Sequence, residues 1–173
     1  TEDVPYLDAE RKLLQAIFAR NEGRFDGAVE LLHAAQQGLG PDQWLLKIIA
    51  QLQIAIAYME VGEFKRSTQL LTELKGEVEV NSQAGLTMLV QVTSFECMLA
   101  SMRGDLNGAK RSAQQTIAVI QASPYILPMV GQIYAMLGGI AYMQNELDEA
   151  QEALTEALHW GERTGITDIL FTA

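Results

Sequence analysis

Gly23-Arg-Phe-Asp-Gly-Ala28 is restated three more times along the chain, as Gly62-Glu-Phe-Lys-Arg-Ser67, Gly104-Asp-Leu-Asn-Gly-Ala109 and Asn145-Glu-Leu-Asp-Glu-Ala150. Successive copies begin 39, 42 and 41 residues apart. A nearly constant period of this length is typical of helical hairpins that stack into a solenoid. Because solenoids generally bind other molecules and seldom catalyse reactions, the pattern indicates architecture more clearly than ligand.

Each copy of the phrase has the chemistry of a turn between two helices. Glycine at its first position can adopt the left-handed conformation that ends a helix, and Asn145 is the next best residue for that role. Two residues later stands a large apolar side chain: Phe25, Phe64, Leu106 or Leu147. Three residues further stands a small one, which lets two helix backbones approach closely: Ala28, Ser67, Ala109 or Ala150.

The same register continues on both sides of the turn. Seven residues before it every repeat has a small residue, namely Ala16, Ala55, Cys97 or Gly138. Nine residues after it every repeat has an apolar residue, namely Leu32, Leu71, Ala113 or Leu154. Small residues facing bulky ones are what close packing of antiparallel helices requires. We therefore expect these two positions to meet inside each hairpin.

The predicted fold is all-α, a right-handed superhelix of about four lengthened helix-turn-helix repeats in one domain. The repeats are expected at 8–40, 42–80, 84–123 and 126–165. Their first helices should cover 8–21, 42–61, 84–103 and 126–144, and their second helices 25–37, 64–77, 106–121 and 147–163. Residues 166–173 have the apolar spacing of a helix that begins a fifth repeat and stops before any cap. We therefore expect the chain to be a fragment of a longer protein.

Composition narrows the functional classes. The formal net charge is −10, from 12 Lys and Arg against 22 Asp and Glu. That balance opposes direct contact with a nucleic acid, whose phosphates attract clustered cations. Cys97 is the only cysteine, which excludes an internal disulfide. With neither a signal peptide nor an unbroken apolar run of membrane length, a cytoplasmic protein without membrane contact is expected.

Catalytic and metal-binding residues are not found in a convergent pattern, so we expect no enzyme activity, metal or cofactor in this segment. His33 and His159 are the only histidines, and neither has ligands at zinc spacing. Cys97 occupies the small-residue position of the third repeat, which predicts a packed side chain rather than a nucleophile. The acidic residues after Asn145 complement a helix dipole and face water.

The first helices carry a candidate binding surface on the face expected to line the inside of the superhelix. The candidate residues lie six, three or two positions before the turn residue: Arg20, Asn21, Met59, Met98, Met102, Gly139, Tyr142 and Met143. Methionine adapts to varied partners and recurs on surfaces that accept peptides or amphipathic helices. Burial of this face as ordinary core explains the same residues equally well. Gly139 beside Tyr142 also predicts a notch with an aromatic wall that could admit a small ligand.

The repeats resemble the tetratricopeptide repeat (TPR), whose second half reads Gly-x-Tyr/Phe/Leu-x-x-Ala in similar spacing. Here the unit is nearer 40 residues than 34 and lacks the helix-opening tryptophan. Three segments, 102–109, 137–150 and 157–165, also look like the helical repeat region of the MalT-like activators, large ATP-binding regulators of the LuxR class. This second resemblance rests on Met102-Arg-Gly-Asp-Leu-Asn-Gly-Ala109, Leu137-Gly-Gly-Ile-Ala-Tyr-Met-Gln-Asn-Glu-Leu-Asp-Glu-Ala150 and Ala157-Leu-His-Trp-Gly-Glu-Arg-Thr-Gly165.

The resemblance implies a place in a larger protein. Such regulators carry an N-terminal nucleotide-binding domain, a superhelical sensor and a C-terminal helix-turn-helix. Their superhelix takes part in inducer recognition and in self-association, so a protein partner, a small-molecule inducer or a homo-oligomer is implied here. This segment has neither a phosphate-binding loop motif nor a basic recognition helix, so ATP and DNA binding are not assigned to it. The alternative is a TPR-type scaffold that holds a partner protein without any inducer.

Overall fold

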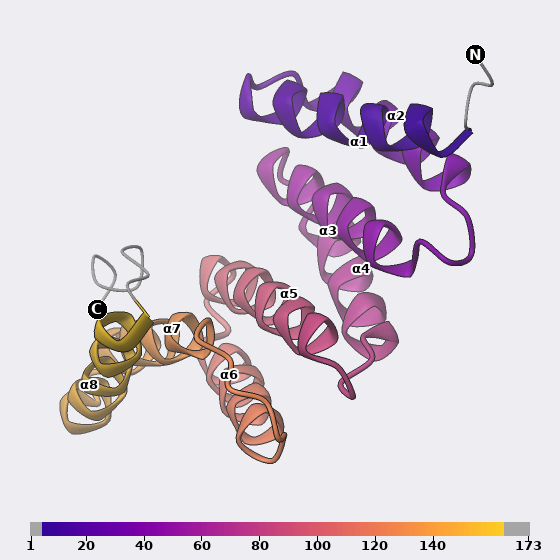
Figure 1. The fold of residues 1–173 in the computed structure, drawn as a ribbon. Coiled ribbons are helices and arrows are strands. Elements are labelled where there is room, and N and C mark those ends of the chain that lie inside the picture. Colours follow the sequence, from indigo (N-terminus) through magenta and orange to yellow (C-terminus); the bar gives the residue numbers. More distant parts are fainter. Residues whose placement is uncertain (1–4, 165–173) are drawn as a thin grey trace. The chain divides into compact units, whose positions relative to one another are not determined.

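The computed structural model describes the backbone of residues 5–164 and the side chains of residues 7–163. These residues form eight α-helices and no strand, as the sequence pattern predicts (Figure 1). The helices are α1 Pro5–Asn21, α2 Phe25–Gly38, α3 Trp44–Glu60, α4 Phe64–Glu77, α5 Gln83–Met102, α6 Leu106–Gln121, α7 Val130–Met143 and α8 Leu147–Thr164. The segment expected to begin a fifth repeat, 166–173, lies outside the described residues.

The helices group into two compact units, residues 1–77 with α1–α4 and residues 78–173 with α5–α8. Each unit contains two antiparallel hairpins. In the first unit α1 pairs with α2 and α3 with α4, and α2 packs against α3. In the second unit α5 pairs with α6 and α7 with α8, and α7 packs against both α5 and α6. The predicted alternation of first and second helices is therefore present in both units.

The start of α7 differs from the prediction, because the helix begins at Val130 rather than near 126. Pro128 restricts Leu127 to an extended conformation and has no N–H to donate. The chain instead passes through a tight turn, in which Val130 N donates to Leu127 O at 3.1 Å. The proline therefore delays the helix by about one turn.

The turn residue of every hairpin has the left-handed backbone that the phrase predicts. The φ angle is 78° at Gly23, 80° at Gly62, 78° at Gly104 and 62° at Asn145, the only non-glycine with positive φ among the described residues. The following N–H donates to the carbonyl five residues earlier, as from Glu146 to Ala141 at 2.9 Å. This Schellman closure satisfies carbonyls that the helix end would otherwise leave unpaired.

The predicted small and large positions are the core of the hairpins. Ala16, Ala55 and Cys97 are fully buried, as are Leu32 and Ala113. In the last hairpin a Cβ added to Gly138 would lie 2.6 Å from Leu154 Cγ, so leucine fills the space that glycine leaves. The register read from the sequence is therefore the register of the packing.

The third hairpin, α5–α6, has a different core chemistry. Its pair is Cys97 and Ala113, where the other hairpins have alanine or glycine against leucine. Cys97 Sγ donates to Ala109 O at 3.3 Å. The hydroxyls of Thr93 and Thr116, both buried, hydrogen-bond to each other at 2.8 Å. Paired buried hydroxyls avoid the cost of unsatisfied polar groups, so this hairpin combines apolar packing with internal hydrogen bonds.

The large apolar residue of each turn is not part of the hairpin core. Phe25, Phe64 and Leu106 are only half-buried, and Leu147 is 56% exposed. These side chains belong to the first residue of the second helix in each hairpin. The interior is filled instead by the residues nine positions after the turn.

Helix α5 is long and apolar enough to cross a membrane by length and composition alone. Its side chains have another role in the described fold, however. Leu86, Val90 and Thr93 are buried, and α5 packs against α6 and α7. The apolar residues of α5 therefore pack against other helices of the second unit.

Candidate functional site

The predicted binding surface divides into a polar part and an apolar part. In the first unit, Arg20 of α1 pairs with Glu60 of α3, with 2.7 Å between Nη1 and Oε1. Arg20 Nη2 also donates to Asn21 Oδ1 at 3.2 Å. These side chains tie the first helices of neighbouring hairpins to each other. Arg20 and Asn21 are thus engaged within the protein, a role that their positions in sequence did not suggest.

Met59 also lies in the first unit and is buried, with 7% of its surface exposed. It follows Ile56 at 4% exposure on the same helix, α3. At Met59 the structure therefore favours ordinary core, one of the two interpretations that the sequence left open. The first unit offers no exposed methionine on this face among its described residues.

The second unit presents the predicted surface to solvent. Met98 and Met102 of α5 are 38% and 59% exposed, and Tyr142 and Met143 of α7 are 69% and 56% exposed. Because α5 packs beside α7, residues of equivalent register such as Met102 and Met143 belong to neighbouring helices. We call Met98, Met102, Tyr142 and Met143 the methionine patch. The structure thus leaves four of the eight candidate residues exposed, on two helices that pack against each other.

Gly139 is exposed next to this patch, and its surroundings bear on the predicted notch. A Cβ built at Gly139 would meet no heavy atom within 4 Å. Glycine there opens onto free space and does not line an enclosed cavity. Such a surface suits a broad apolar partner better than a small molecule, whose binding generally requires a concave site that buries most of it.

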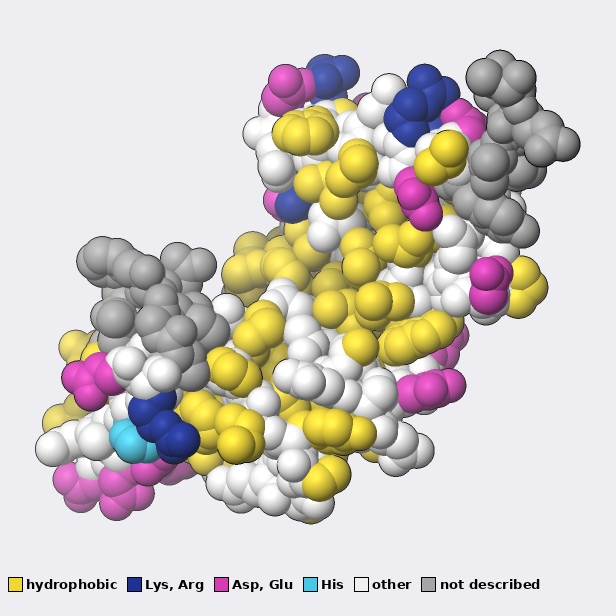
Figure 2. Space-filling view, viewed as in Figure 1, with side chains coloured by type: hydrophobic (Ala, Val, Ile, Leu, Met, Phe, Trp, Pro, Cys, Tyr) yellow, Lys and Arg dark blue, Asp and Glu magenta, His cyan; other side chains and the backbone are white. Residues whose placement is uncertain are grey.

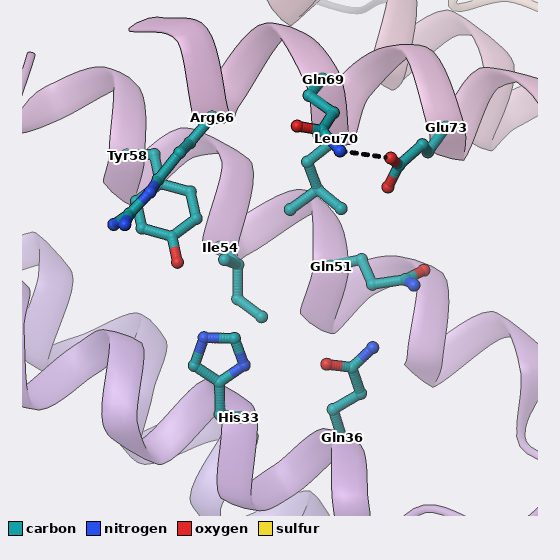
Figure 3. Close-up of a pocket in the computed structure, with 9 residues that line it drawn as sticks. All are labelled: His33, Gln36, Gln51, Ile54, Tyr58, Arg66, Gln69, Leu70 and Glu73. Carbon is teal, nitrogen blue, oxygen red and sulfur yellow. Dashed lines mark hydrogen bonds between the residues drawn. The ribbon is translucent and has the colours of Figure 1, made fainter. Parts of the chain in front are cut away.

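A concave site occurs instead in the first unit, between α2, α3 and α4 (Figure 3). Its volume is about 250 Å³. The floor is Ile54 and Leu70, and the walls are His33, Gln36, Gln51, Tyr58, Arg66, Gln69 and Glu73. Figure 3 shows His33 and Gln36 rising from α2 towards the residues of α3 and α4. An apolar floor with several converging polar groups is the usual composition of a small-molecule site.

The polar groups of this pocket differ in how they are engaged. Arg66 lies over the ring of Tyr58, 5.6 Å from its centre, and Gln69 donates to Glu73 at 2.8 Å. His33, Gln36 and Gln51 make no hydrogen bond to any other described residue, so their donors and acceptors are free for a ligand. Sequence reasoning missed the pocket because its residues come from three helices and share no motif.

The acidic residues at the start of α8 form ion pairs with a lysine that the sequence analysis did not single out. Lys110 of α6 reaches Glu146 and Glu149, with 2.5 Å from Nζ to an oxygen of each. The hydrogen bond and charge of Lys110 lower the pKa of Glu146, and hydrogen bonds to both carboxylates raise the pKa of Lys110. Asp148, Glu152 and Glu156 line the open outer face of α8. Figure 2 shows acidic side chains gathered over this helix.

The remaining candidate groups lie apart from one another. His33 is exposed at the pocket, whereas His159 is exposed on α8 beside Trp160. Cys97 is buried, as its small-residue position predicts. Within residues 7–163, no three histidine, cysteine or acidic side chains come together in a way that could hold a metal ion. The candidate surfaces among the described residues are therefore the methionine patch and the pocket.

Comparison with known proteins gives a family and a fold. A model of the MalT-like TPR region matches residues 9–172. No curated protein matches the chain in sequence. A TPR sensor-containing signal transduction ATPase with numerous domains, from Pyrococcus horikoshii, superposes with a TM-score of 0.73 at 22% identity, over 98% of this chain and 25% of its own. BtubC from P. vanneervenii superposes with a TM-score of 0.72 at 16% identity, over 93% of this chain and 66% of its own.

These likenesses establish an all-α, TPR-like solenoid, a helical scaffold of the kind that serves in protein–protein interaction. The chain spans about a quarter of the length of the P. horikoshii protein and about two thirds of that of BtubC. At these identities the two structures bear on the fold alone.

Proposed function

This chain belongs to the MalT-like TPR family, and from that premise we propose that it is the regulatory recognition module of a MalT-like, LuxR-class transcriptional activator in the cytoplasm. The methionine patch would bind an apolar segment of a partner protein. The single observation that supports this proposal is the exposure of Met98, Met102, Tyr142 and Met143 on two neighbouring helices.

The chemistry of the patch suits a partner that presents an amphipathic helix or an apolar peptide. Methionine side chains are flexible and polarizable, so they repack around differently shaped apolar groups. Tyr142 adds a ring with a polar edge that can hydrogen-bond at the rim of an interface. Isolated exposed apolar residues are common on protein surfaces, but four that are grouped on adjacent helices indicate a binding surface.

Control of the parent protein would follow from differential affinity. A partner that binds one arrangement of the repeats more tightly shifts the population towards that arrangement. A partner that binds all arrangements equally would change nothing, however tightly it bound. The proposed role therefore requires that occupation of the patch alter the contacts that the module makes with the neighbouring nucleotide-binding domain of the activator.

A second candidate function is recognition of a small polar inducer, which the pocket between α2, α3 and α4 favours. The free amides of Gln36 and Gln51 and the ring of His33 can both donate and accept hydrogen bonds. Ile54 and Leu70 supply an apolar floor below them. A neutral molecule with several hydroxyl or amide groups would match this combination.

Methyl NMR of the methionines can test the first proposal on the chain itself. The protein has seven methionines, of which Met98, Met102 and Met143 belong to the patch and Met59 is buried. With ¹³C-methyl labels, titration with amphipathic helical peptides should shift the three patch signals first. The Tyr142→Ala/Met143→Ala variant should lose this response while its far-ultraviolet circular dichroism is unchanged. Full response in that variant would contradict the proposal.

The pocket is tested by a separate experiment, because the absence of inducer binding there would not contradict partner binding at the methionine patch. A thermal-shift screen with sugars and small amides should identify any inducer, and Gln36→Ala/Gln51→Ala should abolish the shift that it causes. Gln114→Ala/Gln115→Ala, on exposed positions of α6, is the matched control and should bind normally. A shift retained in the pocket variant would exclude this site, and the absence of any ligand would favour a scaffold without an inducer.

A further inference from the structure

The pocket between α2, α3 and α4 carries opposite charges at its two ends. Arg66 and Glu73 both line it and lie seven residues apart on α4. At 1.5 Å of rise per residue, the two positions are about 10 Å apart along the helix. Figure 3 shows Arg66 with Tyr58 at one end of the pocket and Glu73 at the other, with Ile54 between them. The pocket therefore has a cationic end and an anionic end.

Both charged groups keep hydrogen-bonding capacity beyond their contacts within the protein. Arg66 pairs with Glu63, with 3.1 Å between Nη1 and Oε2. Its guanidinium has five N–H donors, so this ion pair uses only part of them. Glu73 accepts a hydrogen bond from Gln69 through Oε1 at 2.8 Å. A carboxylate accepts several hydrogen bonds, so Glu73 has room for a further donor.

Between the charged ends the pocket has an apolar floor and neutral polar walls. Ile54 and Leu70 form the floor, and Ile54 is 2% exposed. The walls include Gln36 and Gln51, whose amides both donate and accept hydrogen bonds. Each residue of a peptide other than proline brings one N–H donor and one C=O acceptor, which glutamine amides can pair. The floor suits an aliphatic side chain, because burying it there removes apolar surface from water.

We propose that this pocket binds a tripeptide with free termini, with its carboxylate at Arg66 and its ammonium group at Glu73. An extended chain spans about 3.3–3.6 Å per residue, so three residues match the separation of about 10 Å between the charged ends. A guanidinium can hold a free carboxylate by two parallel hydrogen bonds. An uncharged sugar would leave both charged ends unused. The inference rests on the small-molecule role proposed above for the pocket and names the class of ligand.

Titration of the ¹⁵N-labelled chain with the peptide Ala-Leu-Ala tests the proposal, because the central leucine can lie on the apolar floor. The side-chain amide signals of Gln36 and Gln51 should shift and reach saturation. Acetylation of the N-terminus or amidation of the C-terminus removes one charge, and each should weaken binding roughly two- to fivefold, the effect of one exposed ion pair. The compound 8-aminooctanoate has both charges but no peptide groups, so it should bind more weakly than the peptide.

Variants of the two charged residues assign each end of the peptide. In Glu73→Gln, the acetylated and the free peptide should bind alike, whereas amidation should still weaken binding. In Arg66→Gln the dependence should be reversed, with acetylation alone weakening binding. Lys65→Gln and Glu77→Gln are the matched controls, since both residues are exposed on α4 and neither lines the pocket. The control variants should remain sensitive to both modifications.

The outcomes separate this inference from the broader role of the pocket. Modified peptides that bind the wild type as tightly as Ala-Leu-Ala would overturn the tripeptide proposal, as would modifications with the same effect in both charge variants. Binding of 8-aminooctanoate at the strength of the peptide would also overturn it. A sugar or small amide that binds in the pocket while Ala-Leu-Ala does not would overturn the tripeptide alone and leave the small-molecule role intact. Absence of binding by every class of compound would overturn both.

Discussion

Gly138 of α7 lies directly beneath Leu154 of α8, so closely that a Cβ on Gly138 would come within 2.6 Å of Leu154 Cγ and 3.3 Å of Ala150 O. The two residues belong to the small and large positions that recur in every hairpin. Glycine here is required by packing and not by backbone conformation, because it lies inside a helix. The contact shows how the repeat sets the distance between paired helices.

Gly138→Ala should therefore destabilise the protein although alanine favours helix. Leu154 and the α8 backbone would have to move, at a cost of about 1–3 kcal/mol. Gly139→Ala is the neighbouring control, since a Cβ there meets open space. That variant should gain roughly 0.5–1 kcal/mol from helix propensity. Urea unfolding of both variants measures the difference, and equal effects would show that Leu154 does not restrict position 138.

The Cys97 and Ala113 pair in the core of α5–α6 should be replaceable by the alanine and leucine pair of the first hairpin. Ala113→Leu alone should overpack against Cys97 and cost about 1–3 kcal/mol. Cys97→Ala together with Ala113→Leu recreates the pair found as Ala16 and Leu32, so part of the loss should return. A double-mutant cycle should give a coupling on the order of 0.5–3 kcal/mol, as for residues in contact. Additive effects would mean that the two side chains do not share one space.

The left-handed backbone at Asn145 predicts which of two substitutions, to alanine or to glycine, destabilises the protein more. At φ of 62° a Cβ is crowded, so Asn145→Ala should cost about 1 kcal/mol. Asn145→Gly should be as stable as the wild type or more so, because glycine adopts this conformation freely. Helix propensity alone would rank alanine above glycine. Thermal unfolding of the two variants distinguishes these orders, and a more stable alanine variant would refute the turn geometry.

The bridge from Lys110 to Glu146 should make stability depend on pH in a defined window. The pKa of Glu146 is lowered from its ordinary value of 4.5, so its contribution is present above that value and is lost as the pH falls through the folded pKa. The pKa of Lys110 is raised from 10.5, so its contribution is present below that value and is lost as the pH rises through the folded pKa.

Lys110→Met should therefore be less stable than the wild type at neutral pH, and the gap should shrink in acid and at high pH. Urea unfolding at several pH values measures the gap. In the variant, the NMR titration of the Glu146 carboxyl should move to higher pH. Lys65→Met, on an exposed position of α4, serves as the control. An unchanged Glu146 titration in Lys110→Met would show that the bridge is absent in solution.

Much of the hairpin architecture was predictable because it depends on local chemistry. Positive φ at the turn requires glycine or asparagine, and closely packed helices require small residues at fixed positions. Both kinds of residue therefore recur at a regular spacing in the sequence. The start of α7 was misplaced because Pro128 acts on its own neighbours and interrupts that period. The repeat period did not separate exposed from buried positions on the candidate surface, since Met102 and Tyr142 are exposed whereas Met59 is buried.

The sequence by itself determined the number of described helices, their pairing and the residues that face one another inside each pair, because these follow from spacing along one chain. Only the tertiary structure decided which helix faces meet solvent, since exposure depends on neighbours from other repeats. The tertiary structure showed that Arg20 pairs with Glu60, whereas the residues of the methionine patch are exposed. It also brought His33, Gln51 and Leu70 to one pocket. These residues are far apart in sequence, and a repeat of about 40 residues does not predict which side chains of different repeats meet.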